Sequence, residues 1–177
     1  MNTEHRPEVL ISSREIATTI DRLATEISRD YLGKEPLLLG ILKGSFMFMA
    51  DLIRRLDFQL EVDFVRLSSY GRGTESSGKI QVVQGLRTIV RDREVLVIED
   101  IIDTGLTVAY LLEYLRKKRP ASLRLCTLLD KPSRRRVPVP IDYLGTTIPD
   151  RFLVGYGLDY DERFRNLPDV CVLEDNE

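Results

Sequence analysis

The residues best suited to chemistry are polar side chains that directly follow one apolar segment, residues 95–98. They are Glu99, Asp100, Asp103, Thr104 and Thr107. Threonine hydroxyls and backbone N–H groups at the start of a helix suit a phosphate. Carboxylates repel phosphate, but they bind sugar hydroxyls and Mg²⁺. A segment with both sets of groups is typical of a site for a ribose phosphate, and Gly105 would let the backbone approach such a ligand closely.

The composition excludes several other kinds of chemistry. The chain has 177 residues with one histidine, His5, and two cysteines, Cys126 and Cys171. A Ser-His-Asp or Cys-His catalytic group is therefore nearly excluded, as are a disulfide framework and a zinc site of Cys and His. Catalysis would have to use carboxylates, lysine, arginine or a bound metal.

The charge balance limits the expected partners and the compartment. Lys and Arg number 26 and Asp and Glu 28, which gives a net charge of −2. We therefore expect no nucleic acid and no membrane as partner, and we expect the basic run at residues 131–136 to be a solvated loop beside an anion site. The N-terminus has no apolar segment typical of a signal peptide, and no apolar run is long enough for a membrane span. These features favour a cytoplasmic protein.

Signals for strands and helices alternate along the chain. Ser12 and Glu15 form a capping box, and Gly33 ends the helix that follows it. Helices are predicted at residues 13–31, 46–56 and 107–118, and strands at 37–42, 60–65, 79–83, 95–98, 123–129, 142–145, 152–156 and 170–173. The alternation predicts one α/β domain with a mainly parallel sheet, in keeping with the length of the chain.

A long polar loop at residues 66–79 interrupts this pattern. It is rich in Gly and Ser, and loops of this length are usually functional or disordered. A mobile surface loop and a lid over an active site remain equally open. Gly71 and Gly73 are not followed by the third glycine of a dinucleotide-binding motif, so that function is rejected.

The segment Glu-Asp-Ile-Ile-Asp-Thr-Gly-Leu-Thr at residues 99–107 resembles the phosphoribosyl-diphosphate motif of the type I phosphoribosyltransferases, in the form found in the hypoxanthine-guanine enzymes. Other segments resemble the same family in the same order: residues 42–45, Ser69-Tyr70, Lys131, residues 148–156 and 158–160, and Arg165. The resemblance implies one domain over residues 1–177 with the type I fold. In that fold helices flank a mainly parallel central sheet, and a small hood forms from the N-terminal segment and roughly residues 131–177.

The family resemblance also implies an activity. It is purine salvage, in which the 5-phosphoribosyl group passes from phosphoribosyl diphosphate to N9 of hypoxanthine or guanine, with Mg²⁺, to give IMP or GMP and pyrophosphate. Such enzymes are usually homodimers or homotetramers. A xanthine-preferring relative and a non-catalytic, nucleotide-sensing regulator of the same fold are the alternatives.

The resemblance assigns roles on the sugar-phosphate side of the site. Asp103 is the acid/base residue beside N7 of the purine. The 5′-phosphate is bound by Asp103, Thr104, Gly105, Leu106 and Thr107, and the ribose by Glu99 and Asp100. Pyrophosphate is bound by Lys43, Gly44 and Arg165, and the Leu42–Lys43 peptide bond is expected to be cis. Leu106 departs from the family pattern, since some relatives carry lysine there.

The remaining assignments concern the purine, the metal and the lid. The purine is bound by Lys131, Phe152, Leu153 and Asp159. Within this set Lys131 donates to O6, which disfavours adenine, and Phe152 stacks on the ring. Mg²⁺ is held by Glu99, Asp100 and Asp159, and Ser69 and Tyr70 belong to the lid. Arg151 replaces a lysine that relatives often have.

Overall fold

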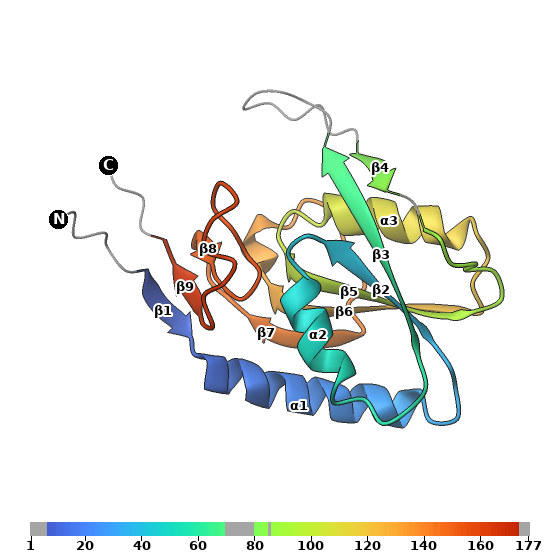
Figure 1. Cartoon of the computed structure of the whole chain (residues 1–177). Helices are drawn as coiled ribbons and strands as arrows, with labels where there is room; N and C mark the ends of the chain where they lie inside the picture. Colours follow the sequence, from blue (N-terminus) through green and yellow to red (C-terminus); the bar gives the residue numbers. More distant parts are fainter. Residues whose placement is uncertain (1–6, 70–79, 85, 174–177) are drawn as a thin grey trace.

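A computed structural model describes residues 7–69, 80–84 and 86–173 (Figure 1). The helices are α1 (Ser13–Asp30), α2 (Phe46–Ile53), α3 (Leu106–Arg116) and a short 3-10 helix, η1 (Pro132–Arg134). The larger sheet contains β2 (Leu37–Leu42), β3 (Glu61–Ser69), β4 (Ile80–Gln84), β5 (Glu94–Ile102), β6 (Ser122–Asp130) and β7 (Tyr143–Thr147). The smaller sheet contains β1 (Glu8–Ile11), β8 (Leu153–Val154) and β9 (Val170–Val172).

The strand order places a ligand-binding position in the middle of the larger sheet. The order is β4-β3-β2-β5-β6-β7, and every neighbouring pair is parallel except β3 with β4. From β2 the chain proceeds to β3 on one side, and from β5 it proceeds to β6 on the other. Ligands of such sheets bind beyond the carboxyl ends of the strands where the direction reverses, which here is between β2 and β5.

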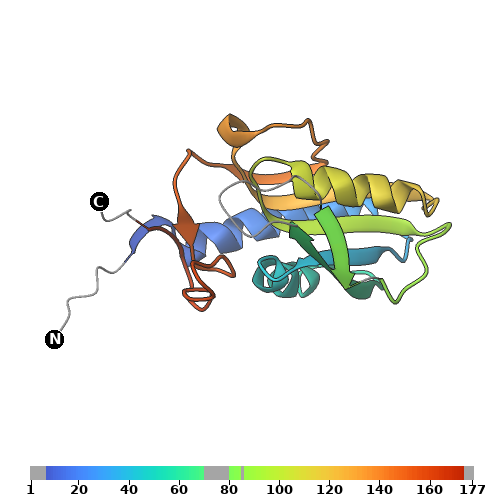
Figure 2. The same cartoon turned by 90° about the horizontal axis from the view of Figure 1, so that it is seen from above.

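Alternate residues of the central strands pack on opposite faces of the sheet. Leu38 and Leu96 join the core with α1 and α2, whereas Leu39 and Val97 join the core with α3. Figure 2 shows α2 and α3 on opposite faces of the sheet. Both faces are therefore covered, which explains why β2 and β5 are almost wholly apolar until Glu99. The α/β fold with a mainly parallel sheet is confirmed.

Helix α1 begins at the predicted capping box. The Ser12 N–H donates to Glu15 Oε2 at 2.8 Å, and the Glu15 N–H donates to Ser12 Oγ at 3.3 Å. Its buried stripe consists of Ile16, Ile20, Leu23, Ala24 and Ile27. Among the described residues, no helix is both long enough and apolar enough to cross a bilayer.

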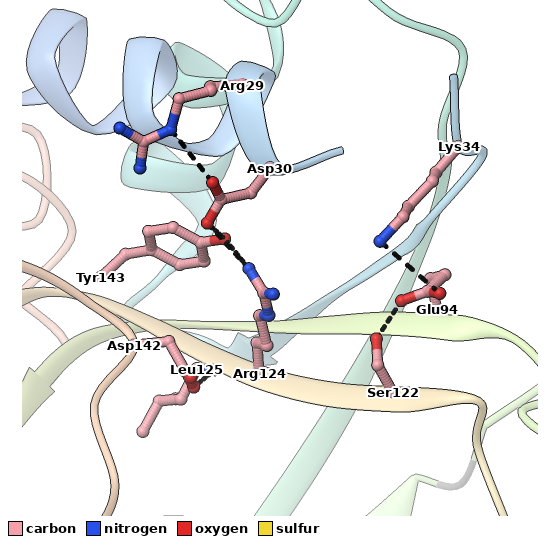
Figure 3. Close-up of polar contacts among 9 residues, drawn as sticks. All are labelled: Arg29, Asp30, Lys34, Glu94, Ser122, Arg124, Leu125, Asp142 and Tyr143. Atoms are coloured by element: carbon pink, nitrogen blue, oxygen red, sulfur yellow. Dashed lines mark hydrogen bonds and ion pairs between the residues drawn. The ribbon is translucent and has the colours of Figure 1, made fainter. Parts of the chain in front are cut away.

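A polar cluster connects the end of α1 to the sheet (Figure 3). Asp30 accepts hydrogen bonds from the Tyr143 hydroxyl at 2.9 Å and from Arg124 Nη1 at 2.8 Å. The Tyr143 bond, with a further contribution from Arg29, holds the pKa of Asp30 below its usual value. Burial raises the pKa of Tyr143 to about 12, so its hydroxyl remains a donor. The cluster therefore fixes the carboxyl end of α1 against β6 and β7.

Several predicted elements have different bounds in the structure. Helix α2 ends at Ile53 rather than residue 56, and its buried residues are Phe48, Met49 and Leu52. Strand β3 continues to Ser69, so the first four residues of the expected lid are strand. Residues 70–79, including Tyr70, lie outside the described residues.

The smaller sheet corresponds to the expected hood. Its order is β1-β9-β8, and both pairs of strands are antiparallel. The pairing of β1 with β9 joins the N-terminal segment to the end of the described chain (Figure 1). Only part of residues 131–177 belongs to it, because β7 pairs with β6 in the larger sheet. The hood thus lies beside the carboxyl edge of the sheet, since the chain passes directly from β7 to β8.

Candidate active site

The candidate site lies at the carboxyl edge of the parallel strands. Lys43 follows β2, Asp103 follows β5 and Lys131 follows β6. These three residues line one cavity of about 660 Å³. The other sequence-predicted residues that line it are Gly44, Asp100, Phe152, Leu153, Asp159 and Arg165. A smaller cavity of about 190 Å³ is also lined by Asp100 and Asp103. The other predicted residues that line it are Glu99, Thr104, Gly105 and Thr107, and Leu106 is not among them.

The turn after β2 is packed between β5 and the hood. The Leu42–Lys43 peptide bond is cis, as expected. A Cβ atom on Gly44 would lie 1.8 Å from Asp100 Oδ2, and a Cβ atom on Gly157 would lie 2.3 Å from the Gly44 carbonyl oxygen. Only glycine fits at these two positions. The Lys43-Gly44 backbone is therefore held directly against an acidic side chain of β5.

The loop between β5 and α3 rests on the segment after Lys131. Gly105 has φ +82° and forms the N-cap of α3, a conformation that favours glycine. The N–H groups of Arg136 and Val137 donate to the Thr104 carbonyl at 2.9 and 3.3 Å. The Leu106 N–H donates to Thr104 Oγ1 at 3.4 Å. Thr104, Gly105 and Thr107 line the smaller cavity, and the start of a helix is a position that suits phosphate.

The basic run at residues 131–136 is exposed at Pro132, Ser133, Arg134 and Arg136, as the sequence indicated, but two of its arginines contact Asp103. Arg134 Nε donates to Asp103 Oδ1 at 3.3 Å, and Arg135 Nε donates to the Asp103 carbonyl at 3.2 Å. Arg135 also forms an ion pair with Asp130 and is largely buried. Sequence reasoning missed both arginines. Both arginines come shortly after Lys131, and that segment begins at the edge of the sheet where the site lies. This position was the signal from which their contacts with the site could have been predicted.

Glu99 and Asp100 are buried carboxylates with no basic partner. Each is only 7 % exposed, and among the described residues neither forms an ion pair with a lysine or arginine. Burial, and then the neighbouring Asp100, raises the pKa of Glu99 well above its usual value. A pair of this kind fits a divalent cation that also binds oxygens of a ligand. The described residues contain no group of three acids that could enclose a metal alone.

Asp159, the third expected metal ligand, has another partner in this structure. Its Oδ1 lies 2.8 Å from Arg165 Nη2, and its Oδ2 accepts from the Glu162 N–H at 2.9 Å. Arg165 Nη1 donates to the Gly157 carbonyl at 2.8 Å. The arginine is thereby fixed at the edge of the larger cavity, and the role of Asp159 toward a metal stays a prediction.

Glu162 is a residue that sequence reasoning missed. Its Oε2 lies 2.8 Å from Lys43 Nζ and 3.1 Å from Arg165 Nη2. Hydrogen bonds from these two cations hold the pKa of Glu162 below its usual value. Its position within an acidic turn gives no sign of these contacts, because Lys43 is distant in the sequence.

The hood side of the cavity offers a flat surface and a buried cation. Phe152 is 46 % exposed, and the ring of Tyr160 contacts it edge-on at a centroid distance of 5.6 Å. Lys131 is 7 % exposed and donates to the Arg151 carbonyl. An aromatic face beside a buried ammonium group suits a planar ring that carries an oxygen acceptor.

Comparisons with known proteins agree with this geometry. The phosphoribosyl transferase domain family matches residues 10–161. The hypoxanthine-guanine phosphoribosyltransferase of Bacillus subtilis is 48% identical over 167 residues, which cover 94% of this chain and 93% of that protein. The corresponding Staphylococcus aureus protein is 46% identical with the same coverage of both chains.

Solved structures give the same result for the fold. A crystal structure of a hypoxanthine phosphoribosyltransferase from Staphylococcus aureus has a TM-score of 0.90 at 46% identity, and the match covers 94% of this chain and 91% of that chain. A hypoxanthine-guanine phosphoribosyltransferase from Bacillus anthracis, with a HEPES molecule in its active site, has a TM-score of 0.90 at 42% identity and coverage of 94% and 98%. The expected type I fold is confirmed, and the chain belongs to the phosphoribosyltransferase family.

Proposed function

We propose that this chain transfers the 5-phosphoribosyl group of phosphoribosyl diphosphate to N9 of hypoxanthine or guanine, releasing pyrophosphate. The observation that carries the proposal is the single cavity that contains Lys43, Asp103, Lys131 and Phe152. It brings an anion-binding turn, a carboxylate, a buried ammonium group and an aromatic face within reach of one bound nucleotide. Relatives named hypoxanthine-guanine phosphoribosyltransferase over almost the whole chain support the same function.

The purine side of the reaction uses Asp103 and Lys131. As N9 attacks C1′ of the ribose, the N9–C1′ bond forms and the C1′–O bond to diphosphate breaks, with its electron pair leaving on the diphosphate. The purine loses a proton from N7, which the Asp103 carboxylate accepts as a general base. Lys131 donates to the 6-oxo group. An amino group at that position offers no acceptor to this ammonium group, so adenine is disfavoured.

The phosphate side relies on backbone donors as well as on cations. The N–H groups and hydroxyls of residues 104–107 bind the 5′-phosphate, and Leu106 contributes its backbone alone. The Lys43-Gly44 backbone and the Arg165 guanidinium bind the diphosphate. These donors stabilise the negative charge that develops on the leaving group.

Glu99 and Asp100 bind the ribose hydroxyls and hold Mg²⁺ together with oxygens of the substrate. The chemistry that the ion supplies is neutralisation of charge on the diphosphate. Asp159 is the third proposed ligand, and it also lies near the position proposed for the purine 2-substituent, with Leu153 beside it. These two buried carboxylates, which have no lysine or arginine partner among the described residues, support this assignment.

Three further points belong to the proposal. The chain works in the cytoplasm on small-molecule partners, namely phosphoribosyl diphosphate and 6-oxopurine bases. It forms a homodimer or homotetramer, which light scattering coupled to gel filtration would measure. Ser69 and Tyr70 begin the lid over the site.

A spectrophotometric assay tests the function. Purified protein is mixed with phosphoribosyl diphosphate, Mg²⁺ and hypoxanthine, guanine, xanthine or adenine in turn. We expect turnover of hypoxanthine or guanine and none of adenine. Preference for xanthine would instead select the xanthine enzyme, and binding of nucleotide without turnover would select the regulator.

The Asp103→Asn variant tests the proposed base. We expect kcat to fall by roughly 10²- to 10⁴-fold, the usual contribution of a general base, while the thermal unfolding temperature stays near that of the wild type. Turnover at the wild-type rate would remove Asp103 from the acid/base role.

A further inference from the structure

One carboxylate, that of Glu162, pairs with the side chains of both Lys43 and Arg165. The proposed function places the diphosphate against the backbone of Lys43 and the guanidinium of Arg165, so both cations lie beside its proposed position. Lys43 Nζ and Arg165 Nη2 approach the same atom, Glu162 Oε2, at 2.8 and 3.1 Å. Two basic groups that converge on one oxygen form the arrangement with which proteins bind a phosphate oxygen. Glu162 therefore lies where an oxygen of the diphosphate would be bound.

The backbone around Glu162 directs its side chain to this position. Glu162 and Asp161 both have positive φ, +63° and +51°, in the tight turn between the bridge partners Tyr160 and Arg163. The Glu162 N–H is fixed to Asp159 Oδ2 at 2.9 Å. A defined turn thus fixes the backbone of Glu162, from which its exposed side chain reaches Lys43 and Arg165.

The contact contributes little to folding. The side chain of Glu162 is 63% exposed and that of Lys43 is 43% exposed. Ion pairs with this much solvent around them are nearly neutral for stability. Their main consequence is electrostatic, because the negative charge of Glu162 offsets two positive charges that a polyanion needs.

Arg165 has contacts other than the one with Glu162, and these would remain if Glu162 moved away. Its Nη1 remains bonded to the Gly157 carbonyl, and its Nη2 is also paired with Asp159 at 2.8 Å. Its Nε is buried and has no hydrogen-bond partner among the described residues. The contacts with Gly157 and Asp159 would therefore keep the guanidinium in place when Glu162 leaves.

We propose that Glu162 is a positioning residue and a built-in competitor of the diphosphate. In the free enzyme its carboxylate gathers Lys43 and Arg165, and the diphosphate displaces it on binding. This inference rests on the proposed function, because that function places the diphosphate against the Lys43-Gly44 backbone and the Arg165 guanidinium. It predicts that Glu162 lowers the affinity for phosphoribosyl diphosphate and for pyrophosphate, whereas purine binding does not depend on it.

The test compares Glu162→Gln with the wild type by titration calorimetry with pyrophosphate and Mg²⁺. Glutamine keeps the size and an oxygen acceptor but removes the charge. We expect the Kd of pyrophosphate to fall about three- to tenfold at low salt, and the difference to shrink at high salt, because one repelling charge near the ligand is removed. The KM for phosphoribosyl diphosphate should fall similarly, with the KM for the purine unchanged.

Glu113→Gln is the matched control. Glu113 lies on α3, near the end remote from the phosphate loop, and pairs with Lys117 at 2.8 Å, so the same loss of one charge occurs away from the site. Its pyrophosphate Kd should equal that of the wild type. A Glu162→Gln protein whose Kd is unchanged or higher would overturn the inference. Because calorimetry needs no turnover, wild-type protein that binds pyrophosphate without converting hypoxanthine would instead overturn the proposed function.

Discussion

Replacement of Gly44 by alanine is a severe test of the proposed geometry. The added Cβ would lie 1.8 Å from Asp100 Oδ2 and 2.6 Å from Asp100 Cγ. Non-bonded heavy atoms attract at about 3.5–4.0 Å and repel steeply at shorter distances. The turn and the carboxylate must therefore separate by more than about 1 Å. Gly44 is not among the glycines with positive φ, so the effect is one of contact rather than of backbone conformation.

The separation falls on the two groups that hold opposite ends of the reacting bond. Asp100 is assigned to the ribose and Mg²⁺, and the Lys43-Gly44 backbone to the diphosphate. A displacement of about 1 Å in such a group can reduce the rate about 10²-fold. We expect kcat/KM for Gly44→Ala to fall about 100-fold or more. The cost in stability should be about 1–3 kcal/mol, as for other overpacked positions.

Gly33→Ala gives the matched control for this experiment. Gly33 has φ +73° and no atom within 4 Å of a built Cβ, so alanine there strains the backbone without a contact. That variant should lose about 1–2 kcal/mol of stability and keep its kcat/KM. Steady-state kinetics and thermal unfolding of both variants separate the two effects. A Gly44→Ala protein with kcat/KM within about threefold of the wild type would refute the placement of the diphosphate against this turn.

Two further predictions concern specificity and pH. In Lys131→Met, kcat/KM for hypoxanthine should fall roughly 10- to 100-fold, because a hydrogen bond from a charged group contributes about that much. The kcat/KM for adenine should stay constant. An equal loss for both bases would contradict the role of Lys131 at O6. In Asp30→Asn, the free energy of unfolding should fall by roughly 1 kcal/mol at pH 7. Because the pKa of Asp30 is lowered in the fold, this difference should disappear as the pH falls below its usual value of 3.8; a difference that persists there would contradict the linkage.

The fold could be predicted largely because its signals are local. Strands β2 and β5 are short apolar segments bounded by polar residues, and the capping box marks the first turn of α1. The positions of Lys43, Asp103 and Lys131 could also be predicted, because each residue follows a buried strand. A parallel sheet then brings these positions to one edge, whatever the details of the loops.

Features that depend on contacts distant in the sequence could not be predicted. The buried face of α2, with Phe48, Met49 and Leu52, depends on which sides of the helix face α1 and the sheet. The basic run was expected to be a solvated loop because the chain as a whole is slightly acidic, and its contacts with Asp103 were not predicted. In the structure Arg134 and Arg135 turn back to Asp103, a contact that forms only after β5 and β6 lie side by side.

The partners of the charged groups show how a site can bind a polyanion although the chain is slightly acidic. Lys43 and Arg165 are compensated by Glu162 and Asp159, and Asp103 is compensated by Arg134. Binding of phosphoribosyl diphosphate to such a site is an exchange of ionic partners rather than an addition of charge. Glu99 and Asp100 differ from these groups because, among the described residues, they have no basic partner to exchange. These two buried carboxylates lie at the position proposed for Mg²⁺, so a bound cation would supply the positive partner that they lack.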